Sequence, residues 1–178
     1  REMEEVLKEA KELLKESNKK AREIDRKIKE LLDDSHRKVK ETVDRVKRRI
    51  EELDRKVKEV KEERLKEELK EEAERVRRDV ERLVEELRRE NDEILEEHRR
   101  LIKELEDENE EVLDRLRKKL RVEEVLREVE KELEDNKREL RESHKEIARE
   151  LERNKEDIDR LVEEIKRRIE ELKKRIDK

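Results

Sequence analysis

The side chains best suited to chemistry in this sequence are three histidines, two of which directly follow a serine. Ser35 precedes His36 and Ser143 precedes His144, whereas His98 lies on a series of apolar residues. Neighbouring residues of a helix point about 100° apart, so neither Ser–His pair places a nucleophile against its base. The chain also has no glycine for a tight oxyanion-hole turn. The sequence therefore predicts no catalytic residue and no enzymatic activity.

The same histidines are poor candidates for a metal site. A zinc ion takes three or four nitrogen, sulfur or carboxylate ligands in tetrahedral geometry, but the chain has no cysteine and no HxxxH pair. In the helix arrangement inferred below, His98 and His144 are offset by about one turn, and His36 lies far from both. We therefore expect no metal site, no cofactor-binding residue and no bound cofactor.

Serine, asparagine and histidine side chains also interrupt apolar stripes that otherwise consist mainly of Leu, Ile and Val. The residues on the stripes are Ser17, Ser35, Thr42, Asn91, His98, Asn109, Asn136, Ser143 and Asn154, and those at the stripe edge are Asn18, His36 and His144. A buried amide costs free energy unless its donors and acceptors find partners, and a partnered amide penalises other helix alignments. These residues are therefore candidates for specifying helix pairing. The alternative, that they face water, applies best to the three edge residues.

Long α-helices are the elements that must position these side chains. Apolar residues recur every 18 positions, for example at Leu133, Leu151 and Ile169. Eighteen residues make five turns at about 3.6 residues per turn, whereas a repeat of about seven residues would impose a left-handed supercoil. Because the chain has no Gly, Pro or aromatic residue and is 65% charged, strands joined by tight turns are excluded. The pattern predicts an all-α protein with nearly straight, untwisted helices.

The apolar pattern slips out of phase twice, which divides the chain into three helices. One slip lies between Val60 and Leu65, and the other lies between Leu120 and Val122. At each slip, lysines or arginines precede a pair of glutamates, as expected where one helix ends and the next begins. We expect helices near residues 1–61, 65–119 and 122–177, with loops centred within about three residues of 63 and 122. Together these helices are expected to form a single domain over residues 1–178.

The polar residues indicate how the three helices pair. If the second helix folds back at residue 63, facing residues have numbers that sum to 126, as for Ser17 with Asn109 and for Ser35 with Asn91. If the third helix folds back near 122.5, facing numbers sum to 245, as for Asn109 with Asn136. The sequence thus predicts an antiparallel up-down-up three-helix bundle with two buried polar layers. The predicted buried polar network comprises Ser17, Asn109, Asn136, Ser35, Asn91, Asn154, His98, Ser143 and His144.

The 18-residue period, the polar layers, and segments such as RRIEELDRKVKEV and EEIKRRIEELKKRI together resemble a de novo designed, parametrically generated helical bundle with buried hydrogen-bond networks. The resemblance covers the whole chain, although the Gly, Pro or Asp-Pro loops common in such designs are absent. It implies a rigid structural scaffold with no natural biochemical function and no natural substrate. In such a scaffold the polar layers specify the register of the helices.

Charge and hydropathy limit the classes of partner. The net charge is −5, and acidic and basic residues are interleaved along the chain. There is no basic stripe for phosphates, no aromatic residue to stack on a base, and no apolar run long enough to span a membrane. We expect a soluble monomer with no natural partner, no nucleic-acid binding and no membrane contact. Its localisation is unknown beyond the cytoplasm of an expression host.

Three alternatives remain open. In the first, the chain is an interaction module that forms a homo-oligomer or accepts another helix. In the second, it responds to pH, because similar designs place histidine in buried networks. In the third, it is one continuous rod that assembles with other chains, which leaves the matching number sums unexplained. Light scattering separates the first from a monomer, and acid titration tests the second.

Overall fold

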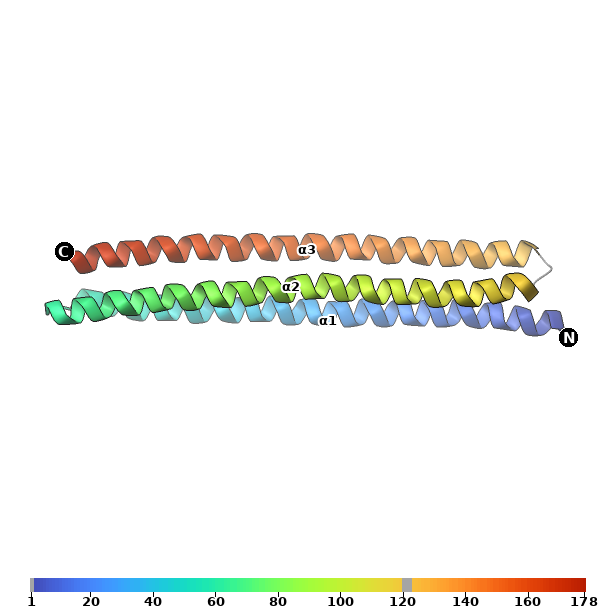
Figure 1. Cartoon of the computed structure of the whole chain (residues 1–178), viewed down its shortest axis with the longest axis horizontal. Helices are drawn as coiled ribbons and strands as arrows, with labels where there is room; N and C mark the ends of the chain where they lie inside the picture. Colours follow the sequence, from blue (N-terminus) through green and yellow to red (C-terminus); the bar gives the residue numbers. More distant parts are fainter. Residues whose placement is uncertain (1, 120–122) are drawn as a thin grey trace. The chain divides into compact units, whose positions relative to one another are not determined.

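Three long α-helices and no strand make up the described part of the chain, which comprises residues 2–119 and 123–178 of a computed structural model (Figure 1). The helices are α1 (Glu2–Glu59), α2 (Glu63–Lys119) and α3 (Glu123–Asp177). The protein is an all-α three-helix bundle. The fold class predicted from the 18-residue repeat is therefore confirmed.

The composition accounts for the length of these helices. Glu, Lys, Arg and Leu have high helix propensity, and no Gly or Pro interrupts them. No described residue has a positive φ angle, so a chain without glycine needs no left-handed backbone there. Charges also complement the helix dipole, because Lys56 and Lys58 lie in the last turn of α1 and Glu63 lies in the first turn of α2.

The connection between α1 and α2 consists of Val60, Lys61 and Glu62. The carbonyl oxygen of Glu62 accepts a hydrogen bond from the backbone amide of Lys66 at 3.1 Å, which makes Glu62 the N-cap of α2. α2 begins at Glu63 and not at 65, because its first turn contains charged residues that precede the first apolar residue. α2 ends at Lys119 and α3 begins at Glu123, and the expected loop centre near 122 lies outside the described residues.

The 18-residue period of the sequence appears as an 18-residue period of burial. Buried series with this spacing are Ser17, Ser35 and Leu53 in α1, Val80, His98 and Leu116 in α2, and Val129, Ile147 and Ile165 in α3. The first two series combine polar and apolar residues. Position on the helix face therefore decides which residues are buried, whether or not their side chains are apolar.

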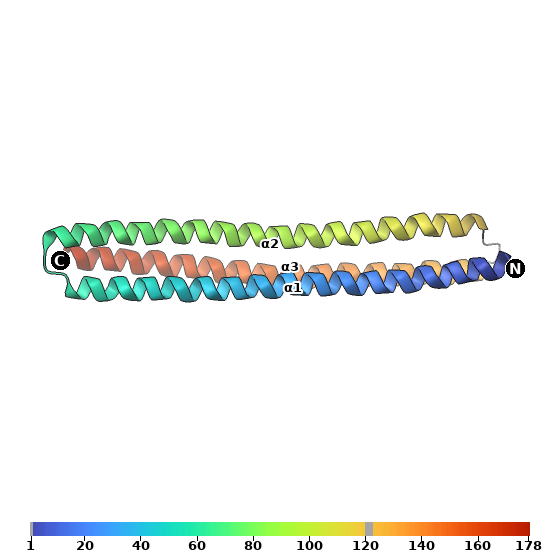
Figure 2. The same cartoon turned by 90° about the horizontal axis from the view of Figure 1, so that it is seen from below.

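The described helices form two compact units, and every helix contributes a segment to each. Unit 1 comprises Arg1–Leu32 and Glu93–Arg149, and unit 2 comprises Asp33–Asp92 and Glu150–Lys178. In each unit the three segments lie side by side in both views of the molecule (Figures 1 and 2). Residues that are far apart in the sequence therefore share one core.

Each unit has an apolar core to which all three helices contribute. In unit 1, this core contains Val6, Ala10 and Leu13 of α1, Leu113 and Leu116 of α2, and Val129 and Leu133 of α3. In unit 2, the most deeply buried members include Val46 and Ile50 of α1, Ala73 and Val76 of α2, and Ile158 and Ile169 of α3. Burial of these aliphatic side chains is the main stabilising contribution, at about 1.5–3 kcal/mol for each fully buried Val, Leu or Ile.

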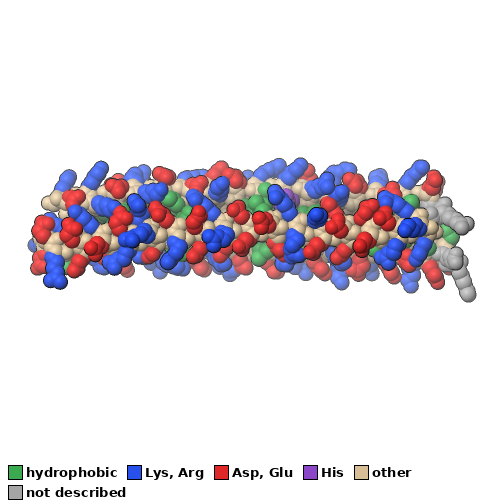
Figure 3. Space-filling model, viewed as in Figure 1, with side chains coloured by type: hydrophobic (Ala, Val, Ile, Leu, Met, Phe, Trp, Pro, Cys, Tyr) green, Lys and Arg blue, Asp and Glu red, His purple; other side chains and the backbone are tan. Residues whose placement is uncertain are grey.

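Charged side chains dominate the surface. On the face shown in Figure 3, Lys and Arg are intermingled with Asp and Glu, and apolar atoms are visible only in small areas between them. Some charges pair across helices, such as Arg49 of α1 with Asp79 of α2 in unit 2 at 3.0 Å. Exposed pairs of this kind contribute only about 0–1 kcal/mol each. None of the described helices contains an apolar stretch long enough to cross a lipid bilayer.

Candidate functional site

Ser17 of α1 and Asn109 of α2 are in contact in unit 1. The side-chain Nδ2 of Asn109 donates a hydrogen bond to Oγ of Ser17 at 2.9 Å. Ser17 is 1% exposed, but Asn109 is only half-buried, which differs from the expectation of full burial. The reason is that Asn109 lines an open pocket of about 220 Å³ whose walls include charged residues such as Glu106 and Lys137.

Asn136 of α3 also lines this pocket, but its hydrogen bond goes to a residue outside the predicted network. Its Nδ2 donates to Oδ1 of Asn18 of α1 at 2.6 Å. The alternative that Asn18 faces water is therefore wrong, since this residue is half-buried and in contact with another helix. Ser17, Asn109 and Asn136 come together around one pocket, and Asn18 is the acceptor for Asn136.

Ser143 of α3 makes a second contact with α1 in unit 1. Its Oγ donates to the carboxylate Oδ1 of Asp25 at 3.1 Å. The two residues are 118 apart in sequence, as are Asn136 and Asn18. A constant difference in residue number between contacting residues indicates two parallel helix segments in one register. The two contacts lie seven residues apart along each helix, or about two turns.

His98 of α2 and His144 of α3 meet in unit 1. Their Nδ1 atoms are 3.0 Å apart, and their ring centroids are 5.0 Å apart with an interplanar angle of 38°. His98 is fully buried and His144 is half-buried, so the alternative that His144 faces water is also wrong. The expected offset does not separate the rings, because about 4.5 Å along the helix axes corresponds to three residues, a distance that two imidazole side chains can span.

Burial favours the neutral form of both histidines of this pair. Burial and the neighbouring His144 lower the pKa of His98 to about 4, although the carboxylate of Asp25 acts in the opposite direction. Burial and the cation of Arg99 lower the pKa of His144. In a neutral pair, one ring carries its proton on Nδ1 and donates it to the bare Nδ1 of the other ring.

Unit 2 contains the other predicted layer, and its hydrogen bonding is less complete. Oγ of Ser35 donates to Oδ1 of Asn91 at 2.7 Å, and Ser35, Asn91 and Asn154 are all buried. The Nδ2 atoms of Asn91 and Asn154 are buried without a hydrogen-bond partner among the described residues. Thr42 is buried as well, whereas His36 is exposed, as expected for an edge residue.

The sequence pattern did not single out Asp25, and it placed Asn18 only at the stripe edge. Both lie at the margin of the apolar stripe of α1, where burial is intermediate. The number sums used for prediction consider only residues at the centre of each stripe. Both residues are 118 positions from their partners Asn136 and Ser143, a separation that the two number sums do not contain.

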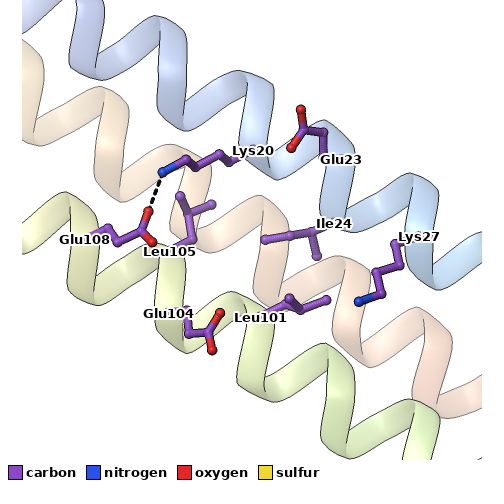
Figure 4. Close-up of a pocket in the computed structure, with 8 residues that line it drawn as sticks. All are labelled: Lys20, Glu23, Ile24, Lys27, Leu101, Glu104, Leu105 and Glu108. Carbon is purple, nitrogen blue, oxygen red and sulfur yellow. Dashed lines mark hydrogen bonds and ion pairs between the residues drawn. The ribbon is translucent and has the colours of Figure 1, made fainter.

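Another pocket of unit 1 lies between α1 and α2 (Figure 4). It has a volume of about 260 Å³, which is below the range of about 300–1,000 Å³ typical of small-molecule sites. Ile24, Leu101 and Leu105 supply its apolar side chains, and an ion pair between Lys20 and Glu108 bridges the two helices at its edge. The nearby Glu97 is bound by Arg100 and Lys27, whose hydrogen bonds lower the pKa of its carboxyl to about 2. These groups are paired with one another, and we assign no ligand to the pocket.

Comparison with known proteins gives a likeness to solved structures. No protein-family model and no curated protein matches the chain. A solved structure described as a "Computationally designed three helix bundle" is similar to it, with 23% sequence identity and a TM-score of 0.39. The alignment covers 98% of this chain and 84% of that one.

The contacts among the described site residues are hydrogen bonds between side chains. Ser143 donates its hydroxyl proton to a carboxylate, and Ser35 donates its own to an amide oxygen. Neither serine is bonded to a histidine that could activate it as a nucleophile. The chemistry available here is hydrogen bonding between helices, together with proton uptake by the histidine pair.

Proposed function

We propose that this chain is a designed structural scaffold whose interior polar side chains fix the register of its helices. The observation that carries the proposal is the pair of α1–α3 contacts in unit 1 that share a separation of 118 residues. The 18-residue repeat and the absence of Gly, Pro, Cys and aromatic residues support a designed origin. The proposal includes no enzymatic activity and no natural substrate.

Polar contacts distinguish helix registers that an aliphatic core cannot distinguish. Layers of Leu, Ile and Val offer similar packing when one helix slides by a turn, about 5.4 Å. A slide of that size in unit 1 separates Asn136 from Asn18 and Ser143 from Asp25 together. These four residues are half-buried, so each hydrogen bond lost costs about 0.5–1.5 kcal/mol, and the alternative register is disfavoured by more than packing alone.

The register role can be tested by removing these polar contacts and measuring a distance between α1 and α3. Spin labels on Lys11→Cys and Lys131→Cys, both exposed in unit 1, report that distance by double electron–electron resonance. The parent should give one narrow distribution. A variant with Asn18→Leu, Asp25→Leu, Asn136→Leu and Ser143→Ala should stay helical, because apolar replacement of a whole polar cluster is often neutral or stabilising. Its distribution should broaden or gain a second peak about one helical turn away.

Thr42→Val, carrying the same labels, is the matched control. It removes a buried polar group from unit 2 and leaves the labelled contacts unchanged, so the parent distribution should persist. Circular dichroism checks that every variant is folded. A distribution in the apolar variant as narrow as that of the parent would refute the register role.

A second candidate function is a response to pH, and the contact between His98 and His144 favours it. Protonation of both rings would place two positive charges in contact, and these would repel each other. Asp25 of α1 is the nearby anion, and Arg99 of α2 is a further cation. Helix content and molar mass should then change reversibly as the pH falls from about 7 through about 4, the pKa of His98. Unchanged values over that range would exclude a switch.

A further inference from the structure

We propose that His98 and His144 together bind a divalent transition-metal ion of tetragonal preference, Cu(II) above all, through their two Nδ1 atoms. Imidazole nitrogen is a favoured ligand of copper, and Cu(II) binds nitrogen and oxygen sites more strongly than the other divalent first-row ions. The proposal is independent of the register role, because it concerns a ligand of one side-chain pair and not the pairing of helices.

The separation of the two ring nitrogens suits a chelate. Their Nδ1 atoms are 3.0 Å apart. If an ion were bonded to both nitrogens at about 2.0–2.1 Å, the N–metal–N angle would be about 95°. Neighbouring ligands in square-planar and tetragonal complexes are separated by about 90°. The rings come from different helices, α2 and α3, so the ion would link two segments of unit 1.

The surroundings of the pair allow access and supply countercharge. His144 is half-buried, so part of this residue is accessible to solvent, whereas His98 is fully buried. From α1, Asp25 lies near enough to influence His98, and it also accepts the hydrogen bond of Ser143 from α3. Arg99 of α2 is the opposing cation. Among the described residues no group of three or more His, Cys, Asp or Glu side chains is arranged to hold a metal, so the proposed site has two protein ligands.

Metal binding competes with protons, and here that competition is mild. Burial keeps the pKa of both rings below the ordinary value, so their lone pairs stay available in slightly acidic solution. The single Nδ1 proton of the neutral pair moves to Nε2 of its own ring when the ion binds, and no proton is released. Nε2 of His98 is buried without a partner among the described residues, and a proton placed there lowers the affinity below that of three-ligand sites.

The test is a titration of the full chain with Cu(II) at about pH 7 in a buffer that does not coordinate copper. We expect binding in a one-to-one ratio, with an electron paramagnetic resonance spectrum showing two imidazole nitrogens. His144→Gln should weaken binding by at least the roughly 10- to 100-fold loss that follows removal of even an outer-sphere partner. This variant is preferred because His144 is half-buried, so its replacement disturbs the core less than replacement of the fully buried His98.

His36→Gln is the matched control, since it removes an exposed histidine and leaves the pair intact. It should bind Cu(II) like the parent. Nuclear magnetic resonance gives a second readout, because paramagnetic broadening should affect the imidazole signals of His98 and His144 before that of His36. Equal affinity of the parent and His144→Gln, or a spectrum with fewer than two imidazole nitrogens, would overturn the proposal.

Discussion

A single buried histidine, His98, couples the stability of this protein to pH. The pKa of His98 is lowered to about 4 from 6.5, with burial as the largest cause. The unfolded chain therefore binds more protons than the folded chain between these values, so the free energy of unfolding rises with pH across that window. The contribution is complete above the unfolded pKa and is lost as the pH falls through the folded one.

The first prediction follows from that sign. Acidification from about pH 7 to about pH 4.5 should lower the free energy of unfolding by roughly 1–3 kcal/mol through His98, at about 1.4 kcal/mol per pKa unit. Urea unfolding followed by circular dichroism measures this loss. The double variant His98→Asn with His144→Asn should be less sensitive to pH, while His36→Asn should behave like the parent. Equal sensitivity in all three proteins would contradict the prediction.

The second prediction concerns the bond between Asn109 and Ser17. Asn109→Ala should lower the free energy of unfolding by about 0.5–1.5 kcal/mol, the usual net value of a hydrogen bond, because Asn109 is only half-buried. A double-mutant cycle with Ser17→Ala should give a coupling energy of similar size. Additive single effects would show that the contact contributes nothing.

Asn154 provides a contrast within the same set of predicted residues. Its Nδ2 is buried without a hydrogen-bond partner among the described residues. Asn154→Leu removes that unsatisfied donor and keeps similar volume, so it should leave stability unchanged or raise it. A loss as large as that of Asn109→Ala would mean that Asn154 makes a bond in solution.

At the scale of elements, the helices could be predicted because they depend on periodic information. Burial in α3 at Val129, Ile147 and Ile165 repeats the sequence period directly. The start of α2 was harder to predict, since the connection Val60–Lys61–Glu62 contains none of the residues that usually mark a turn. The sequence places His98 and His144 in one network but offsets them by about one turn, because number sums describe backbone positions and not the reach of side chains that brings the rings together. The straightness of the helices stays a prediction.

The third prediction concerns the N-cap of α2. Glutamate is not a favoured N-cap, whereas serine accepts a bond from the free amides of the first turn. Glu62→Ser should therefore raise the free energy of unfolding by about 0.5–1 kcal/mol. Glu68→Ser places the same residue inside α2 at an exposed position and should lower it slightly. Thermal unfolding by circular dichroism compares the two, and the same sign for both changes would refute the assignment of Glu62.

At the scale of the whole molecule, the fourth prediction is that the chain is a monomer. The large apolar side chains exposed among the described residues are Met3 at 44% and Leu65 at 42%, which provide no contiguous patch for a partner. Light scattering should give a molar mass near 22.2 kDa at micromolar concentration. A dimeric or trimeric mass would favour the interaction-module alternative.

The single-domain organisation expected from the sequence also stays a prediction at this scale. The described residues form two compact units that share all three helices. Native-state hydrogen exchange tests whether the units unfold together, because a single cooperative domain gives the same opening free energy for the most protected amides of both. Distinct values for Ile28 of unit 1 and Ile50 of unit 2, both fully buried, would show independent unfolding.

The discontinuity of the two units has a consequence for synthesis on the ribosome. Unit 1 requires residues up to Arg149, and unit 2 requires residues up to Lys178. While the nascent chain emerges, α1 and α2 can associate, but each unit lacks its third helix segment until α3 has been synthesised. Their apolar stripes stay uncovered during that interval, which is when a chain is most prone to aggregation. A stop codon after α2 would therefore leave both units incomplete, and no single cut in the chain can release either unit whole.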